Sequence, residues 1–298
     1  MRVRVLGATE AWRGAERLLL GSRKRRALVA ALALSGGRPV SVDALVDLLW
    51  GDAPPDGVAG TLQVYVSGLR RVLEPDRAPR APASVLVTVE PGYALVLPEG
   101  GLDADRFDRA VSDAHRLLAA PGGQAEPPWA PTQVPVPDLR AAHASLGEAL
   151  DLWRGTPYVE LEDAPAAVAE RARLEELRAV ALEDRAVAAL ALGDHATVAV
   201  ELEALTARYP LRERLWALRA LALARAGRQA DALEALTTVR SVLDEELGLE
   251  PGTELRALQT AVLRQDPALA WSPPPGGQVV TVRAADAQRL LRESAEET

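Results

Sequence analysis

The sequence predicts a mainly α-helical protein with a small β component. The chain has 298 residues, of which 48% are hydrophobic and only 4% aromatic. Because aromatic and β-branched residues favour strands, this composition favours packed helices over a large sheet. Strand-like alternation of apolar residues occurs within the first 98 residues, whereas the chain beyond residue 102 follows helical periodicity. A length near 300 residues is also typical of two domains.

The first 98 residues alternate between short strands and helices. Residues 2–5 alternate between arginine and valine, and three short strands are expected before about residue 20. Helices are expected over residues 23–35, 42–50 and 58–73. Ser22 and Ser41 stand where N-caps are needed, and the turn Glu90-Pro91-Gly92 lies between two apolar runs that form a β-hairpin. Strands, three helices and a terminal hairpin, in this order, predict a winged helix-turn-helix domain over residues 1–98.

Residues 102–268 are expected to form an all-α domain. Asp103 is expected to cap its first helix. Helices are expected over residues 103–118, 139–153 and 166–192, followed by the pairs 195–208 with 211–226 and 229–246 with 253–265. Gly193 and Gly227 stand in equivalent turns 34 residues apart, which is the period of tetratricopeptide helix pairs. Most signature residues of that repeat are missing, so the domain is predicted to be tetratricopeptide-like.

Two segments lack helical periodicity. Six prolines fall within residues 121–137, where they exclude a helix and predict an extended loop. Residues 269–298 begin with a run of prolines and glycines and are expected to form a linker and a C-terminal tail. One weak helix is expected in that tail around residues 284–297.

The composition excludes several classes of function. Cysteine is absent, which excludes disulfide scaffolds, thiolate zinc sites, iron–sulfur clusters and cysteine nucleophiles. The three histidines, His115, His143 and His195, form no pair with metal-ligand spacing, and His195 is expected to be a turn or cap residue. No phosphate-binding loop, serine-hydrolase, zinc-protease or calcium-loop motif is present. The sequence therefore predicts neither an enzyme nor a bound cofactor or metal.

The sequence also predicts a protein without a membrane partner. No run of about 18 apolar residues occurs, and the start of the chain does not resemble a signal peptide. We therefore expect a soluble, cytoplasmic protein.

Charge is divided unequally along the chain. Residues 1–98 carry 13 basic and 9 acidic side chains, a net charge of +4, whereas residues 99–298 carry 21 and 33, a net charge of −12. A basic first part joined to an acidic remainder suggests one module for a polyanion and another for a different partner. Charge alone also allows a chance fluctuation.

The helix expected over residues 58–73 is the most informative segment. Its apolar residues Leu62, Val66, Leu69 and Leu73 share one face, which places the following polar residues outward: Gln63, Ser67, Arg70 and Arg71. Glutamine and arginine match the hydrogen-bonding groups of bases and phosphates, and an α-helix fits the major groove. An ordinary solvated helix with a basic C-terminal end has the same pattern. The position of this helix between a helix-turn segment and a hairpin, in a basic domain, favours DNA binding.

Two neighbouring segments could hold the DNA backbone. Four successive basic residues, Arg23 to Arg26, stand at a helix N-terminus, where backbone N–H groups can receive a phosphate oxygen. Thr88 and Tyr93 flank the hairpin turn that would form the wing, although Tyr93 fits a packing role equally well.

These residues resemble the Streptomyces antibiotic regulatory protein (SARP) family over about residues 1–268. The matching motifs in the first part are Lys24-Arg25-Arg26-Ala27-Leu28, Leu49-Trp50-Gly51-Asp52-Ala53-Pro54, Thr61-Leu62-Gln63-Val64-Tyr65-Val66-Ser67-Gly68-Leu69-Arg70-Arg71 and Gly92-Tyr93-Ala94-Leu95. Those in the second part lie at residues 150–155, 173–178, 209–214, 227–230 and 246–248, and resemble the bacterial transcriptional activation domain of that family. Several motifs in one order make the resemblance specific.

The resemblance implies a transcriptional activator with an OmpR-type winged helix. It would bind direct repeats in double-stranded promoter DNA as a homodimer and recruit RNA polymerase through its sigma factor and alpha subunit, in the cytoplasm at the nucleoid. It would regulate a pathway of secondary metabolite (antibiotic) biosynthesis. The DNA-binding residues that it implies are Arg23, Lys24, Arg25, Thr61, Gln63, Ser67, Arg70, Arg71, Thr88 and Tyr93. The residues that it implies for polymerase contact are Trp50, Asp52 and Asp56.

The sequence departs from the family pattern in places and leaves one alternative open. Gly60 and Gly68 lower the helicity of the expected recognition helix and remove two possible contacts. Larger family members carry an ATPase module after this region, so no nucleotide switch is expected here. The alternative is a protein-interaction adaptor whose helical domain is the working part and whose DNA binding is weak or lost. Steep salt dependence of duplex binding would distinguish the activator from the adaptor.

Overall fold

The computed structural model describes residues 1–51, 53–78, 80–119, 129, 132–161 and 164–276. It is 61% helical, with short strands confined to the first 95 residues, which confirms the predicted fold class. The chain divides into two compact units. Unit 1 comprises residues 1–116 and 142–185, and unit 2 comprises the described parts of residues 117–141 and 186–298.

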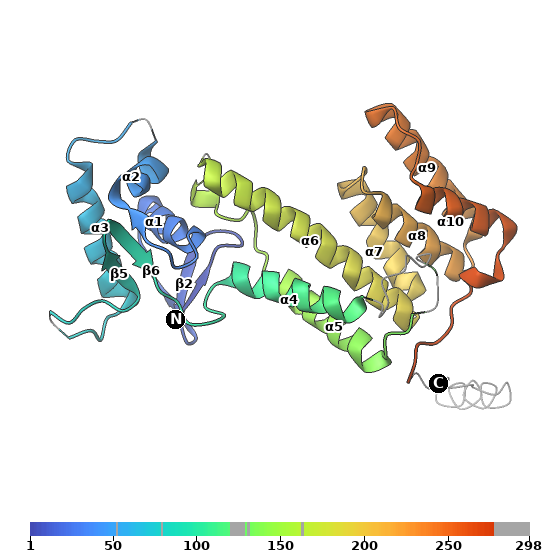
Figure 1. Ribbon diagram of the computed structural model, residues 1–298, viewed down its shortest axis with the longest axis horizontal. Coiled ribbons are helices and arrows are strands. Elements are labelled where there is room, and N and C mark those ends of the chain that lie inside the picture. Colours follow the sequence, from blue (N-terminus) through green and yellow to red (C-terminus); the bar gives the residue numbers. More distant parts are fainter. Residues whose placement is uncertain (52, 79, 120–128, 130–131, 162–163, 277–298) are drawn as a thin grey trace, which may run out of the picture. The chain divides into compact units, whose positions relative to one another are not determined.

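Two small antiparallel sheets frame the start of unit 1 (Figure 1). The first contains β1 (Arg2–Arg4), β2 (Glu10–Arg13) and β3 (Glu16–Leu18), in which Val3 pairs with Ala11 and Ala11 with Leu18. The second has the order β4-β6-β5, formed by β4 (Val40–Ser41), β5 (Leu86–Val89) and β6 (Gly92–Leu95). These elements confirm the three early strands and the terminal hairpin.

Three helices lie between the first sheet and the β5–β6 hairpin along the chain. They are α1 (Arg23–Leu34), α2 (Val42–Trp50) and α3 (Val58–Leu73). Ser41 caps α2 through its hydroxyl, which accepts a hydrogen bond from the Ala44 N–H at 3.2 Å. Ser22 stands at the N-cap of α1 but forms no side-chain cap. Buried residues Leu28, Leu32 and Leu45 anchor α1 and α2 in the core of the unit, so the winged-helix order predicted from sequence is confirmed.

The helices of unit 1 continue beyond the winged helix. Unit 1 includes α4 (Asp103–Leu118) as far as residue 116, part of α5 (Val136–Leu150), η1 (Val159–Leu161) and the first part of α6 (Pro165–Leu192). The expectation that Asp103 caps α4 is wrong, because its buried carboxylate accepts hydrogen bonds from the Val5 and Leu6 N–H groups instead. Helix α5 also begins before the predicted loop ends, since proline is tolerated in the first helical turn.

Unit 2 contains two helix pairs. The first is α7 (His195–Arg208) with α8 (Glu213–Arg225), and the second is α9 (Gln229–Leu247) with α10 (Thr253–Arg264), followed by η2 (Pro267–Leu269). Leu202, Leu215 and Leu236 belong to a continuous apolar core across these helices. Gly193 and Gly227 both adopt positive φ angles, +95° and +78°, in equivalent turns. The predicted helix pairs are confirmed, whereas the helix expected at 284–297 lies outside the described residues.

Candidate nucleic-acid interface

Helix α3 separates its apolar and polar residues as the sequence predicts. Its inner face consists of the buried residues Leu62, Val66, Leu69 and Leu73. Gln63, Ser67 and Arg71 are exposed on the opposite side. Arg71 forms no side-chain hydrogen bond or ion pair with any residue in the described part of the chain. Three side chains that can form hydrogen bonds are thus displayed along a rigid helix.

Arg70 takes a different direction from Arg71. Its Nε donates to the Leu86 carbonyl oxygen at 2.8 Å, and its Nη2 donates to the Thr88 hydroxyl at 2.7 Å. The guanidinium also lies 5.9 Å from the centre of the Tyr93 ring. The structure therefore brings three predicted DNA-binding residues together at the hairpin. Arg70 connects α3 to that hairpin, which makes it a positioning residue for the wing.

Glu74, directly after α3, connects this helix to the residues that precede β5. Its Oε1 accepts hydrogen bonds from the Ser84 N–H at 2.7 Å, the Ser84 hydroxyl at 2.6 Å and the Val85 N–H at 3.2 Å. Burial acts to raise the pKa of Glu74, but these hydrogen bonds and the nearby Arg77 guanidinium outweigh it, so the pKa is lowered. Sequence reasoning missed Glu74. Its position directly after α3 is the one signal in the sequence that points to it.

Basic side chains at the start of α1 pack on aromatic rings next to α3. The Trp50 and Tyr65 rings are stacked, with centres 6.1 Å apart and planes 9° from parallel. The Lys24 ammonium lies 5.4 Å from the Trp50 ring and donates a hydrogen bond to the Leu49 carbonyl oxygen. The Arg25 guanidinium lies 5.9 Å from the Tyr65 ring. The aromatic pair thus holds two cations beside α3, a role for Tyr65 that sequence reasoning missed.

Gly68 provides space for one of these cations. A Cβ atom added at Gly68 would lie 3.0 Å from Nη2 and 3.1 Å from Cζ of Arg25. The glycine, which the sequence alone identified as a weakness of the helix, therefore allows the guanidinium to lie against the helix backbone.

The cations of this surface have neutral partners. Within the described residues, Lys24, Arg25 and Arg70 contact carbonyl oxygens, a hydroxyl group and aromatic rings, and none of them pairs with a carboxylate. Such contacts fix the position of a cation without neutralising its charge. We define the basic surface as Lys24, Arg25, Arg70 and Arg71. It keeps a positive potential suited to a polyanion.

The remaining predicted site residues have varied surroundings. Arg23 is exposed at the first position of α1, and Thr61 is half-buried in the first turns of α3. Asp56 is exposed in the segment between α2 and α3, whereas Trp50 is half-buried in its ring stack. Asp52 lies outside the described residues.

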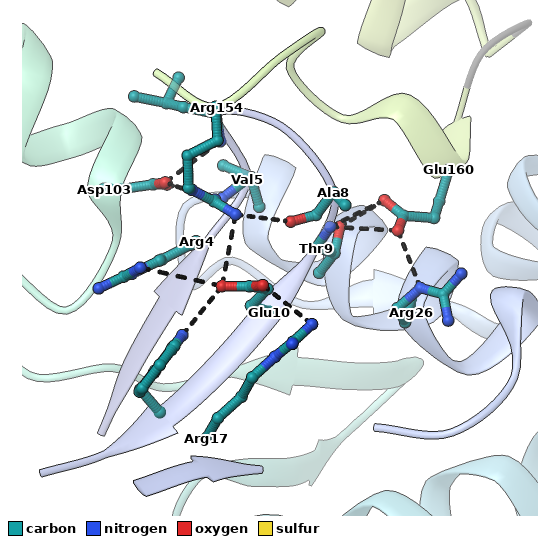
Figure 2. A network of polar contacts seen from close by, with 12 residues as sticks. Arg4, Val5, Ala8, Thr9, Glu10, Arg17, Arg26, Asp103, Arg154 and Glu160 are labelled. Atoms are coloured by element: carbon teal, nitrogen blue, oxygen red, sulfur yellow. Dashed lines mark hydrogen bonds and ion pairs between the residues drawn. The ribbon is translucent and has the colours of Figure 1, made fainter. Parts of the chain in front are cut away.

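Arg26 differs from its basic neighbours because it is paired with a buried carboxylate (Figure 2). Its Nε donates to Oε1 of Glu160 at 3.0 Å. Glu160, with only 3% of its side chain exposed, also accepts from the Thr9 hydroxyl at 2.6 Å and from the Thr9 N–H. This network attaches η1 to α1 and to the first sheet.

A second polar network joins the same parts of unit 1 (Figure 2). Arg154 donates to the Ala8 carbonyl oxygen at 3.1 Å and lies 3.4 Å from both Glu10 and Asp103. Burial raises the pKa of Asp103, and the hydrogen bonds from Val5 and Leu6 and the Arg154 charge offset this only in part. We call these two networks the junction. It joins the winged helix to residues 102–116 and 142–161 within unit 1.

Metal clusters and membrane-spanning helices are both missing from the described residues. No group of three or more potential metal ligands occurs among them. No described helix is long and apolar enough to cross a membrane.

Two family models match the chain. The model for "Transcriptional regulatory protein, C terminal" matches residues 16–95, and the model for "Bacterial transcriptional activator domain" matches residues 132–263. The first covers α1 to α3 and the hairpin, and the second covers most of the helical remainder.

Relatives identify the family. The regulatory protein DnrI of Streptomyces peucetius is 38% identical over 272 residues, which cover 90% of this chain and 94% of DnrI. The chain belongs to the Streptomyces antibiotic regulatory protein family of transcriptional regulators. The regulatory protein AfsR of Streptomyces coelicolor is 41% identical over 271 residues, which cover 91% of this SARP but only 25% of AfsR. The chain thus spans about a quarter of the length of that relative.

A solved structure is similar to this SARP over nearly its whole length. The structure of Mycobacterium tuberculosis EmbR in complex with a low-affinity phosphopeptide matches with a TM-score of 0.75 and 29% sequence identity. The match covers 99% of this chain and 70% of the EmbR chain. Family and fold agree with the resemblance that the sequence motifs indicate.

Proposed function

We propose that this SARP is a sequence-specific DNA-binding transcriptional activator. It binds direct repeats in double-stranded promoter DNA as a homodimer and recruits RNA polymerase through the sigma factor and the alpha subunit. It regulates secondary metabolite biosynthesis, acts in the cytoplasm at the nucleoid, and is neither an enzyme nor dependent on a cofactor. Residues 1–98 provide DNA binding, and residues 102–268 provide activation.

One observation carries the DNA-binding part of this proposal. The exposed face of α3 displays hydrogen-bonding side chains beside a set of cations that have neutral internal partners. An α-helix fits the major groove of B-DNA, and unneutralised arginines attract phosphates. An adaptor without DNA affinity would gain nothing from keeping these charges unpaired on one surface.

The site residues take separate parts in binding. Gln63 has the amide geometry to recognise adenine, while Ser67 and Arg71 contact neighbouring base edges or phosphates. Arg23 and the first N–H groups of α1 receive a backbone phosphate. Thr61 contacts the backbone at the start of α3, and the wing residues Thr88 and Tyr93, held by Arg70, contact the sugar–phosphate edge.

Binding-site selection followed by a competition assay tests this function. The full-length protein is used to enrich duplexes from a random pool, and the affinity of Arg71→Ala for the enriched duplex is measured by gel shift. Loss of one groove contact is expected to weaken binding by about 10-fold or more. Arg264→Ala is the matched control, because Arg264 is an exposed arginine on α10. Absence of any enriched duplex, or equal affinity of both variants, would contradict the proposal.

The polymerase contact is assigned to Trp50, Asp52, Asp56 and the rest of the segment between α2 and α3. Its described residues 53–57 are all exposed, so the segment is accessible to a large partner. Asp56→Arg is expected to reduce transcription from a promoter carrying the enriched repeats while duplex affinity stays within about twofold. In-vitro transcription with purified polymerase measures the first quantity and gel shift the second. Full activation by Asp56→Arg would remove Asp56 from the polymerase contact.

A further inference from the structure

Val64 is the most exposed apolar side chain of the recognition helix. Its exposure is 61%, whereas the other large apolar residues of α3 are buried or half-buried. Valine is not a strong helix former, and an exposed valine gains nothing from the core. The α3 fold therefore does not account for an apolar residue at this position.

Two glycines make Val64 protrude from the helix. Gly60 and Gly68 stand four residues before and after it, which are the positions whose side chains would cover Val64 on an α-helix. A Cβ atom added at Gly60 would meet nothing within 4 Å. At Gly68 the Arg25 guanidinium takes the place of a side chain. The side chain of Val64, 61% exposed, is thus accessible to a partner that approaches the helix on the Gly60 side.

The surroundings of Val64 restrict the chemistry of that partner. Gln63 and Ser67, both exposed, lie beside it, and Arg71 lies on the same side of the helix two turns later. A small apolar group bordered by an amide, a hydroxyl and a cation matches the major-groove edge of A·T pairs. There the thymine 5-methyl group is the only apolar feature and adenine offers N6 and N7 to an amide. An apolar protein partner would instead meet polar side chains around the valine.

We infer that Val64 determines specificity by contacting the 5-methyl group of a thymine, next to an adenine recognised by Gln63. The inference rests on the proposed function, since it requires α3 to lie in the major groove. Gly60, which leaves open space beside Val64, lets the helix approach the bases closely enough for this contact.

Substitution of thymine by deoxyuridine tests the contact, because it removes only the methyl group. Thymines of the enriched duplex are replaced one at a time, and dissociation constants of the wild-type protein and Val64→Ala are measured on each duplex. Burial of one methyl group corresponds to about a fourfold change in affinity. At one thymine of each repeat, deoxyuridine is expected to weaken wild-type binding about fourfold. Val64→Ala is expected to show a similar loss on the thymine duplex and no further loss on the deoxyuridine duplex.

Val200→Ala is the matched control, since Val200 is 65% exposed on α7. It is expected to respond to each deoxyuridine as the wild type does. Equal losses for Val64→Ala on thymine and deoxyuridine duplexes, or no loss on either, would overturn the inference while the proposed function stands. Failure to enrich any duplex would overturn both.

Discussion

The arginines beside α3 and several arginines of the later helices have different partners. Arg25 and Arg70 contact rings, a carbonyl oxygen and a hydroxyl group. The later helices pair their arginines with carboxylates: Arg173 with Asp108 and Glu170, Arg219 with Glu203, Arg228 with Asp231, and Arg240 with Glu250. Arginine is abundant in both regions, and carboxylate-paired arginines occur in both, so neither number nor pairing alone marks a surface. Arg25 and Arg70 are distinguished by neutral partners grouped beside the exposed face of α3.

Removal of both α3 arginines is expected to have the largest effect. Arg70→Ala combined with Arg71→Ala removes one groove contact and the support of the wing, and is expected to weaken specific duplex binding by about 100-fold or more. Neither side chain is fully buried, so the fold survives and far-UV circular dichroism is expected to be unchanged. The control, Arg228→Ala combined with Arg240→Ala, removes the same charge and is expected to leave duplex affinity within about threefold of the wild type. If both double variants bind alike, the contrast between the two regions has no functional meaning.

Breakage of the junction is expected to reduce stability without reducing DNA affinity. Glu160→Gln leaves only one acceptor oxygen for Thr9 and removes the charge that pairs with Arg26. Loss of such a buried partner costs about 1–3 kcal/mol. Urea denaturation of the full chain measures this loss. Affinity for the enriched duplex is expected to be unchanged or slightly higher, because Arg26 loses its carboxylate. If the Glu160→Gln variant is fully folded but binds the duplex much more weakly, Glu160 belongs to the DNA interface.

Substitution of Gly68 is expected to change stability and binding in opposite directions. Gly68→Ala raises helix stability by about 0.5–1 kcal/mol, because the three atoms nearest to the new methyl group belong to the flexible end of Arg25, which can move away. Displacement of that guanidinium is expected to weaken duplex binding about threefold. Thermal unfolding and gel shift measure the two effects. An increase in both thermal stability and duplex affinity would show that the position of Arg25 does not affect DNA binding.

Acid is expected to loosen the wing through Glu74. Because its pKa is lowered in the folded state, Glu74 stabilises the protein above its ordinary pKa of 4.5, and this contribution is lost as the pH falls through the lower folded value. Glu74→Gln is therefore expected to have a flatter stability profile than the wild type below pH 4.5. Denaturation midpoints at several pH values measure the profile. Parallel profiles for the two proteins would rule out this role for Glu74.

The smallest effect is expected at an exposed ion pair. The Nε of Arg228 lies 2.6 Å from Oδ2 of Asp231 at the start of α9, and both side chains are exposed. Arg228→Ala is expected to change the free energy of unfolding by no more than about 0.5 kcal/mol, as is common for surface pairs. Urea denaturation measures this free energy. A change above about 1 kcal/mol would show that this exposed pair stabilises unit 2 more than surface ion pairs usually do.

Periodicity and turn residues were sufficient to predict the fold. The bounds of α3 and its buried face followed from Leu62, Val66 and Leu69, whose spacing depends only on local sequence. The junction could not be predicted, because Thr9 and Glu160 are 151 residues apart and no local pattern connects them. Asp103 illustrates the same limit, since its residue type fits an N-cap although its carboxylate accepts from the Val5 and Leu6 N–H groups directly after β1.

The candidate site was predicted as a set of residues rather than as a set of roles. Gln63, Ser67 and Arg71 followed from helical geometry and are exposed as expected. The adjacent Arg70 was assigned the same role, but its direction depends on the Leu86 carbonyl and Thr88, which the chain brings to α3 only after a loop. Gly68 was interpreted as a missing contact, because the guanidinium that lies against it comes from a different helix.

Methylation interference on the enriched duplex tests most directly whether α3 lies in the major groove. Methylation of guanine N7 modifies only the major groove, and methylation of adenine N3 modifies only the minor groove. Interference by N7 methylation is expected within each repeat, and Arg71→Ala is expected to weaken it at one position. Tight binding that N7 methylation leaves unchanged throughout both repeats would contradict this account.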